Sequence, residues 1–358
     1  MVSKDRNIEL QHHIPIIIVN WNGYTDTVEC IDSVFNLSYP DFKIYLVDNG
    51  SEAGEGRKLA DRYSGESKIE VILSDENMGF TLANNFVVDR LIDTNITYIA
   101  LLNNDTVVDE DWLSNLVRSA ESNAAQVISS KILDYNDHSI LDNAGHRMLN
   151  TGEVIPIGHG EPSSHYQENF KNLGSCAAGA LYHMDMVRQI GFFDTYFSTG
   201  YEDAEFGMRA FLTGNACIFE PSAVVYHKFG SSIKKVFNAN YVSMIQRSIW
   251  YSYFKLMPWP VVMVSLPFIL VKVFLFTVFN LIFWRPRHLK MYWRSLRDVL
   301  WTDRVKLANS RRAFHQSFPI ISSWKVLTSQ TFFLFFDLKR FVDFYLKGKP
   351  SAWDQYGS

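Results

Sequence analysis

The chain of 358 residues contains only three cysteines. Cys30, Cys176 and Cys217 are odd in number and far apart, so they predict neither a disulfide framework nor the closely paired cysteines of a zinc site. A signal peptide is also lacking, since residues 1–13 are polar and mixed in charge and the apolar run that follows ends at Asn20. We therefore expect a protein of a reducing, cytosolic compartment.

The two signs of charge are unevenly distributed, although the whole chain has a net charge of only −4. Residues 1–250 contain 18 Lys and Arg against 33 Asp and Glu, a net charge of −15. Residues 251–358 contain 16 against 5, a net charge of +11, and many aromatic side chains. Such a region predicts contact with an anionic surface, and its apolar runs favour a lipid membrane over nucleic acid as the partner.

Short apolar runs alternate with helical patterns over the first part of the chain. Runs typical of strands buried on both faces of a parallel sheet occur at 14–20, 43–48, 69–73, 98–102 and 127–132. Apolar residues at helical spacing follow Thr25, Thr81 and Asp109. The alternation predicts an α/β fold with a doubly wound, mostly parallel sheet. Further strands are expected at 176–182, 216–221 and 224–227, with a hairpin at 141–157 and a loop at 159–172.

Polar residues lie at the ends of three of these strands. Asn20, Asp48 and Asp105 each stand at or just after a carboxyl end. Ligands of open α/β sheets bind at this edge, so the three side chains predict a ligand site. Loops are polar in any case, and the pattern alone also fits ordinary strand exits.

The stretch 199–211 places two acids, Glu202 and Asp203, at the start of an amphipathic helical pattern, with Glu205 two positions further on. Acidic residues complement the positive end of a helix dipole, so this start by itself fits a purely structural role equally well. A carboxylate placed beside a bound nucleotide would be suited to accept a proton from an attacking hydroxyl.

Several short motifs occur in a fixed order along residues 14–255. They are Val19-Asn-Trp-Asn-Gly23, Val47-Asp-Asn-Gly-Ser51, Asn77-Met-Gly-Phe-Thr-Leu-Ala-Asn-Asn85, Asn103-Asn-Asp-Thr106, Gly179-Ala, Phe193-Asp-Thr-Tyr-Phe197, Gly200-Tyr-Glu-Asp203 and His227. Each motif is weak alone. In this order the set resembles glycosyltransferase family 2, and within it the bacterial rhamnosyltransferase-like branch.

The resemblance implies a GT-A fold, the α/β fold of transferases that use nucleotide-diphospho-sugars. The catalytic domain would cover residues 1–250, with a nucleotide-binding half at about 14–135 and an acceptor-binding half at about 136–250. Residues 251–358 would form a helical, membrane-associating region. The nucleotide-sugar would bind at Val19, Asn20, Asn22, Asp48, Asn77, Gly79, Asn85 and Asn104, with Asp48 on the base.

The second half would supply the acceptor site and the proton acceptor. By the same resemblance, Ala178, Gly179 and Tyr201 would bind the acceptor. Asp203 would be the general base of an inverting displacement, and Glu202 would shape the pocket or touch the donor sugar.

A divalent cation, Mn²⁺ or Mg²⁺, is implied at Asp105 and His227, because such ions usually meet diphosphate oxygens. An imidazole ligand suits Mn²⁺ better than Mg²⁺. The family's metal motif is often Asp-X-Asp, but its first position here is Asn103, an amide that brings less charge to a cation. A lone histidine is more often structural, and the sequence leaves the identity of the metal open.

Two apolar runs dominate the C-terminal region. Residues 256–284 contain one charge, Lys272, and are long enough to cross a bilayer. Basic residues follow at once, and these prefer the same cytosolic side as the catalytic domain. We therefore expect a re-entrant or interfacial segment broken at Pro267, with a pair of buried core helices as the alternative. Residues 324–346 are expected to lie in the membrane interface.

Together these implications predict a peripheral or monotopic glycosyltransferase at the cytoplasmic face of the plasma membrane. Its acceptor would be a glycan on a polyprenyl diphosphate in bacterial surface polysaccharide synthesis, and its donor, by resemblance alone, dTDP-L-rhamnose. A galactofuranosyl or hexosyl donor fits the same scaffold. A nucleotidyltransferase is disfavoured because residues 20–23 form no Gly-rich basic loop, and a non-catalytic scaffold because Asp105, Asp203 and His227 are all present.

Overall fold

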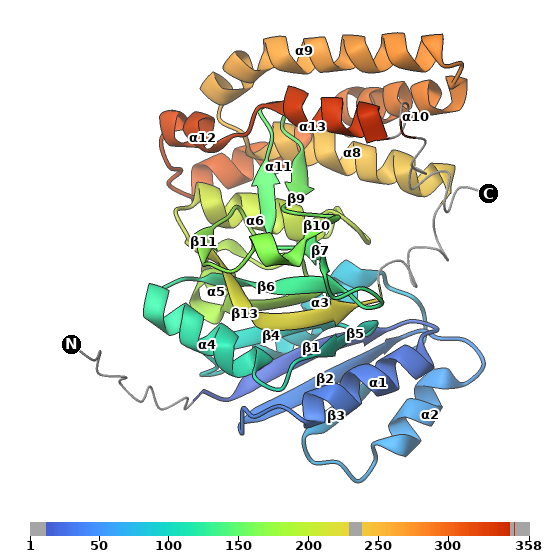
Figure 1. The fold of residues 1–358 in the computed structure, drawn as a ribbon, viewed down its shortest axis with the longest axis vertical. Coiled ribbons are helices and arrows are strands. Elements are labelled where there is room, and N and C mark those ends of the chain that lie inside the picture. The colour runs from blue at the N-terminus through green and yellow to red at the C-terminus, as the bar shows by residue number, and fades with distance from the viewer. Residues whose placement is uncertain (1–11, 229–237, 344–346, 348–358) are drawn as a thin grey trace. The chain divides into compact units, whose positions relative to one another are not determined.

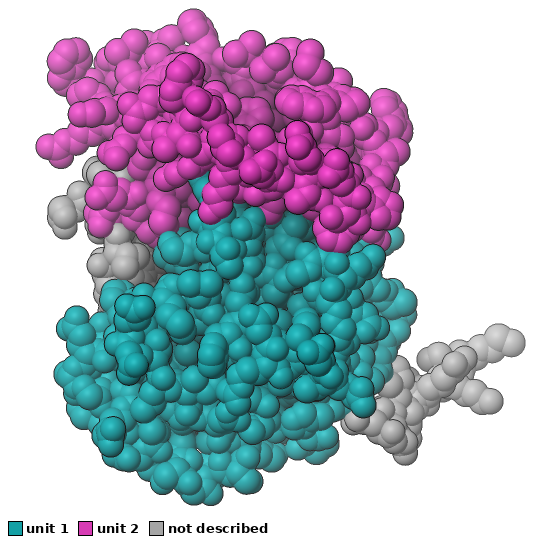
Figure 2. Space-filling model, turned by 180° about the vertical axis from the view of Figure 1, so that it is seen from behind, with its two compact units in different colours: residues 1–146, 156–211, 215–229 teal, residues 147–155, 212–214, 230–358 magenta. Residues whose placement is uncertain are grey.

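The computed structural model describes residues 12–228, 238–343 and 347. The chain forms two compact units (Figure 2). The first comprises residues 1–146, 156–211 and 215–229, and the second comprises residues 147–155, 212–214 and 230–358. Two short internal segments and the end of the predicted catalytic domain, residues 230–250, therefore belong to the second unit. The domain boundary at residue 250 stays a prediction, and the end of the run predicted at 324–346 lies outside the described residues.

The first unit is built on a sheet with the strand order β10-β7-β6-β12-β4-β1-β2-β3 (Figure 1). Its parallel part consists of β1 (Ile14–Asn20), β2 (Phe42–Asn49), β3 (Ile69–Ser74) and β4 (Tyr98–Asn103). The apolar side chains of β1 and β2 are buried, as expected for strands covered on both faces. The predicted α/β class with a largely parallel sheet is confirmed. Asn20 lies opposite Asp48, and Val19 lies opposite Asn103, so three strand ends adjoin.

The other half of the sheet contains antiparallel pairs. β12 (Gly179–His183) is antiparallel to β4 and to β6 (Val127–Asp134), and β7 (Ile140–Asn143) is antiparallel to β6 and to β10 (Glu161–Pro162). β13 (Cys217–His227) joins the two strands predicted at 216–221 and 224–227 into one, with an irregularity between Glu220 and Val224. It pairs with β6, β11 (Phe170–Lys171) and β5 (Thr106–Val108), a strand that the sequence pattern did not predict.

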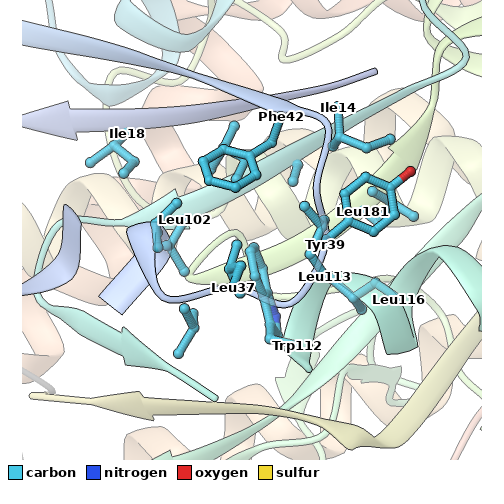
Figure 3. Close-up of a cluster of buried hydrophobic side chains, with 14 of the residues drawn as sticks. Ile14, Ile18, Leu37, Tyr39, Phe42, Leu102, Trp112, Leu113, Leu116 and Leu181 are labelled. Carbon is cyan, nitrogen blue, oxygen red and sulfur yellow. The ribbon is translucent and has the colours of Figure 1, made fainter. Parts of the chain in front are cut away.

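The helices of the first unit are α1 (Tyr24–Phe35), α2 (Glu55–Arg62), α3 (Phe80–Leu91), α4 (Trp112–Asn123), α5 (Met184–Ile190) and α6 (Glu202–Leu212), with a 3-10 turn η1 (Ser163–His165). The sequence pattern missed the short helices α2 and α5. Trp112 of α4 is fully buried against Leu37 and Leu113 (Figure 3), and its Nε1 donates to Ser130 Oγ at 2.8 Å. Thus α4 is anchored to β6, and the core holds the strand ends in place.

The second unit is helical, with α8 (Ala239–Leu256), α9 (Trp259–Ile282), α10 (Pro286–Arg297), a π-helical turn η2 (Asp298–Thr302), α11 (Arg304–Ser317), α12 (Ser323–Ser329) and α13 (Phe333–Phe341). The segment 147–155 enters it from the paired strands β8 (His146–Met148) and β9 (Val154–Pro156).

The helix α9 continues through Pro267, so the predicted break at this proline is wrong. Pro267 is exposed, and the outer face leaves room for its ring at the expense of one main-chain hydrogen bond. By length and hydropathy, α9 could cross a membrane, and it is the one such helix in the described part of the chain. Only 22% of its most apolar stretch is buried.

Candidate active site

The carboxyl ends of β1 and β2 are joined by a buried polar network. Asn20 Nδ2 donates to Asp48 Oδ1 at 2.7 Å, and Ser51 Oγ donates to the same oxygen at 2.6 Å. Asp48 also packs against Gly56, where an added Cβ would lie 2.2 Å from Asp48 Oδ2. Asp48 is only 3% exposed, so its carboxylate is fixed within the protein. Its predicted contact with a nucleotide base stays a prediction.

The neighbouring asparagines belong to the same network. Asn104 Nδ2 donates to Thr27 Oγ1 at 2.9 Å and to Asn20 Oδ1 at 3.3 Å. Asn22 has a positive φ of 52° and accepts a hydrogen bond from Glu52 N through Oδ1 at 2.8 Å. Val19 is half-buried one residue before the end of β1. The structure therefore brings Val19, Asn20, Asn22, Asp48 and Asn104 together at one edge of the sheet.

The turn Asn77–Gly79 is a second part of this edge. Asn77 Oδ1 accepts hydrogen bonds from Asn49 Nδ2 at 3.0 Å and from Gly79 N at 2.8 Å. Gly79 has a φ of +85°, and an added Cβ there would lie 2.7 Å from Ser198 O. A glycine is therefore required at this close approach. Asn85 uses its Nδ2 to donate to Phe193 O at 2.8 Å, and its predicted place at the nucleotide stays a prediction.

The segment Ala177–Gly179 connects Asp203 to the end of β4. Ala177 N donates to Asp203 Oδ2 at 3.1 Å, and the carbonyl of the next residue, Ala178, accepts from Asn103 N at 3.2 Å. Gly179 leaves no space for a side chain, because an added Cβ would lie 2.8 Å from Val225. Asp203 is half-buried, so part of the residue remains accessible. The predicted base thus lies beside the predicted nucleotide edge.

Glu202 differs from Asp203 in its surroundings. Its side chain is buried, and Oε2 has no hydrogen-bond partner among the residues that the structure describes. Burial, and secondarily the charge of Asp203, raise the pKa of Glu202 to about 8. Burial thus favours the protonated carboxyl group, which can donate a hydrogen bond. Tyr201, just before it, has a φ of +81°, a conformation that costs energy for a residue other than glycine.

Glu202→Gln is expected to remove part of the pH dependence of stability. Because the folded-state pKa lies above the ordinary 4.5, Glu202 stabilises the fold most below pH 4.5, and this contribution decreases as pH rises to about 8. Thermal unfolding across that window should show wild type losing stability relative to the Gln variant, by at most about 1.4 kcal/mol per pH unit. The exposed Glu66→Gln serves as the control. A constant difference between wild type and Glu202→Gln would contradict the assignment.

The third acid of this helix, Glu205, is structural. Its fully buried carboxylate accepts two hydrogen bonds from Arg209 Nε, at 2.9 and 2.8 Å. Arg209 also donates to the carbonyls of Ile190, Gly191 and Phe192. The pair therefore fixes α6 to the turn that follows α5. Three acids that look alike in the sequence thus have three different environments.

Asp105 and His227 meet, as predicted, at the exit of β4. His227 Nε2 lies 3.3 Å from Asp105 Oδ1, and Nδ1 lies 2.8 Å from Asp142 Oδ2. Lys228 N donates to Asp105 O at 2.9 Å and holds β13 against the strand exit. Burial lowers the pKa of His227, but hydrogen bonds to Asp105 and Asp142 outweigh it and raise the pKa to about 10. For Asp142, hydrogen bonds from His159 and His227 outweigh burial and lower the pKa to about 2.

The residues present fit a divalent cation held jointly with a substrate. Over residues 12–228, 238–343 and 347, no cluster of three or more His, Cys, Asp or Glu could hold a metal alone. Asp142 and Asp105 face opposite nitrogens of the imidazole, so only Asp105 and Nε2 of His227 can meet on one ion, and an ion bound there would have to displace the proton of Nε2. Asp142 would orient the imidazole from behind. An ion with two protein ligands would complete its shell with diphosphate and water oxygens.

Two further groups near the site were not predicted from the sequence. Asp142 lies on β7, far along the chain from the motifs, and only its contact with His227 reveals it. His146 is buried, and its Nδ1 has no hydrogen-bond partner within the described ranges. Burial lowers its pKa, and the charge of Asp203 opposes this shift. His146 N donates to Gly174 O at 2.8 Å, and Gly174 packs against Gly207 of α6. No sequence pattern marks either residue.

Comparison with known proteins relates the first unit to enzymes that transfer sugars. Residues 16–191 match the model described as "Glycosyl transferase family 2". Bifunctional glycosyltransferase pgtA of Dictyostelium discoideum is 25% identical over 127 residues, which cover 35% of this chain and 16% of the relative. Glycosyltransferase GlyG of Streptococcus pneumoniae serotype 4 is 21% identical over 124 residues, which cover 35% of this chain and 40% of the relative. Glycosyltransferase AglE of Haloferax volcanii is 22% identical over 122 residues, which cover 33% of this chain and 39% of the relative.

The aligned segment spans at most 40% of the length of these curated relatives. Among solved structures, one described as "Crystal structure of GalNAc-T7 with UDP, GalNAc and Mn2+" superimposes with a TM-score of 0.52. The match covers 69% of this chain and 51% of that one. At 17% sequence identity, the superposition shows a shared fold and nothing more specific.

Proposed function

Because residues 16–191 form a glycosyl transferase family 2 domain with the GT-A fold, we infer that this chain transfers a sugar from a nucleotide-diphosphate donor to an acceptor hydroxyl. The observation that carries the inference is the position of Asp203. Its carboxylate is half-buried, accepts the N–H of Ala177, and is linked through Ala178 to the end of β4. An accessible carboxylate at the ligand edge of an α/β sheet is suited to general-base catalysis.

In the proposed reaction Asp203 takes the proton of the acceptor hydroxyl as its oxygen attacks the anomeric carbon, with inversion of configuration. The nucleoside diphosphate leaves with the bonding electron pair. Glu202, whose protonated form is favoured by burial, would in that form add no negative charge to the site and could donate a hydrogen bond to a sugar hydroxyl. Asp105 and His227 would hold a divalent cation, which supplies positive charge to the leaving diphosphate when bound. Asn20, Asn22, Asn77 and Gly79 would position the nucleotide.

The favoured donor is dTDP-L-rhamnose, and this choice rests on the motif resemblance alone. A galactofuranosyl or hexosyl donor uses the same scaffold, and the GalNAc-T7 structure contains UDP and GalNAc. We propose a polyprenyl-diphosphate-linked glycan as the acceptor, in bacterial surface polysaccharide synthesis. The basic, aromatic C-terminal region supports a location at the cytoplasmic face of the plasma membrane.

The proposal is tested with a panel of sugar nucleotides, incubated with the full chain and with Mn²⁺, Mg²⁺ or a chelator. We expect slow release of nucleoside diphosphate from one donor, dependent on the cation. Asp105→Asn should raise the Mn²⁺ concentration needed for half-maximal release, by about 10- to 100-fold if the cation is held as described. The exposed Asp185→Asn is the matched control. Release of pyrophosphate would indicate a nucleotidyltransferase, and no release from any donor would favour a non-catalytic scaffold.

A further inference from the structure

The helix α9 has two distinct faces. One is buried and includes Val261, Val262, Ser265, Ile269 and Asn280. The other is exposed and consists of apolar side chains at helical spacing, namely Met263, Val264, Leu270, Val271, Phe274, Leu281 and Ile282. Phe274 is 66% exposed and Met263 64%, which is unusual for such large apolar groups in contact with water. A long apolar strip therefore runs along one side of α9 only.

The single charge of α9 lies on its inner face. Lys272 Nζ is 2.5 Å from Glu153 Oε2 and 3.6 Å from Asp337 Oδ2 of α13. Arg340 joins the group at 3.8 Å from Glu153. The side chains of Lys272 and Glu153 are 12% and 14% exposed, so the cluster is largely covered within the second unit. The outer strip of α9 is consequently free of charge, although the helix contains a lysine.

The second unit exposes further apolar and basic side chains on its other helices. Exposed apolar residues of α13 are Leu334, Phe335 and Leu338. Exposed tryptophans occur at both ends of α9, at Trp259 and Trp284, and on other elements at Trp293, Trp301 and Trp324. The helix α10 exposes Arg287, Lys290, Arg294 and Arg297. Tryptophan together with Lys and Arg beside an apolar strip is the composition of a surface that meets lipid headgroups.

We propose that α9 lies within one leaflet of an anionic bilayer, parallel to the membrane plane. Its outer strip faces the acyl chains, and the cations of α10 lie at the level of the lipid phosphates. This inference rests on the membrane association proposed above and specifies its geometry. With 24 residues α9 would be about 36 Å long, enough to cross a bilayer. A crossing helix, however, would carry the Lys272–Glu153–Asp337 cluster into the hydrocarbon core, where charged groups are strongly disfavoured.

The experiment places a spin label at Val264, Leu270 or Leu281, each through a single cysteine substitution in the full chain. The native thiols provide a low background, because burial raises the pKa of Cys30 and of Cys217 to about 12 and that of Cys176 well above its ordinary value. Unsubstituted protein measures this background. A label at Asp185, whose side chain is 79% exposed, is the control that stays in water. Label depth is measured on vesicles of phosphatidylcholine and phosphatidylglycerol.

We expect the three labels on α9 to have the same shallow depth, in one leaflet. Arg287→Gln and Lys290→Gln should each weaken binding to these vesicles by about fivefold, and pure phosphatidylcholine should bind less protein. A Leu270 label deeper than both Val264 and Leu281 labels would show a crossing helix and overturn the proposal. The proposal would also be overturned if the protein did not bind vesicles, or if a dimer shielded the labels from lipid. Donor cleavage, measured without vesicles, reports separately on the proposed activity.

Discussion

Asp203→Asn is expected to reduce turnover by about 10²- to 10⁴-fold while leaving donor affinity nearly unchanged. The amide cannot accept the proton of an attacking hydroxyl. The residues assigned to the nucleotide lie outside α6, at the ends of β1, β2 and β4, at the Asn77 turn and on α3. Turnover is measured as transfer or as nucleoside diphosphate release, and donor affinity by calorimetry with the intact sugar nucleotide. A variant with wild-type turnover would remove Asp203 from the mechanism.

The same substitution has a local structural effect that the experiment must separate. One carboxylate oxygen of Asp203 accepts from Ala177 N and the other from Ala204 N, at 3.1 and 2.7 Å. An amide has one acceptor oxygen, so Asn can keep only one of these bonds. Thermal unfolding of the variant therefore accompanies the kinetics, and the exposed Asp185→Asn controls for an Asp-to-Asn change elsewhere. A loss of donor affinity together with turnover would indicate a displaced loop rather than a missing base.

Arg209→Met is expected to destabilise the first unit by about 3–5 kcal/mol, because it leaves Glu205 as a buried charge without its cation. The variant also loses the hydrogen bonds to the carbonyls of Ile190, Gly191 and Phe192. Urea unfolding measures the change in the free energy of unfolding.

Two matched variants make this measurement specific. Arg188→Met removes an arginine that pairs with Asp185 at the surface, and its effect should be smaller. The double variant Glu205→Met with Arg209→Met removes both charges and should recover much of the lost stability. If Arg209→Met lowers the free energy of unfolding by no more than Arg188→Met, the buried pair does not stabilise α6 in the way described.

Much of the fold could be predicted because buried strands are recognisable in the sequence as short apolar runs. The apolar runs of β1, β2 and β4 and the polar residues at their ends give strand positions and the ligand edge without any structure. The antiparallel direction of β12 could not be predicted, because its small residues fit parallel and antiparallel neighbours equally well. The helix α2 was missed because its residues are mostly polar, and β5 because three residues form no recognisable period.

The site residues that directly follow predicted strands could be predicted from the sequence. Those that lie far from the motifs in the sequence could not. Asp105 and His227 were assigned to one metal site from the order of the motifs. Asp142, which contacts His227, lies in the segment predicted as a hairpin at 141–157, where no motif marks it. Residue type and spacing alone did not separate the acids of α6, and only the family resemblance gave Asp203 and Glu202 different roles. Their difference lies in the surroundings, since Glu202 is buried without a partner among the described residues while Glu205 has Arg209.

The contact between the Asn77–Gly79 turn and Ser198 links the loop before α6 to the nucleotide edge. Thr81 N donates to Ser198 O at 3.1 Å, and Asn85 holds Phe193 O, so residues 193–198 are tied to α3 at both ends. Arg209 of α6 in turn holds the carbonyls of Ile190, Gly191 and Phe192, directly before this loop. The loop is therefore fixed to α3 on one side and to the helix of Asp203 on the other, so a substitution that displaces it would disturb the nucleotide edge and the proposed base together.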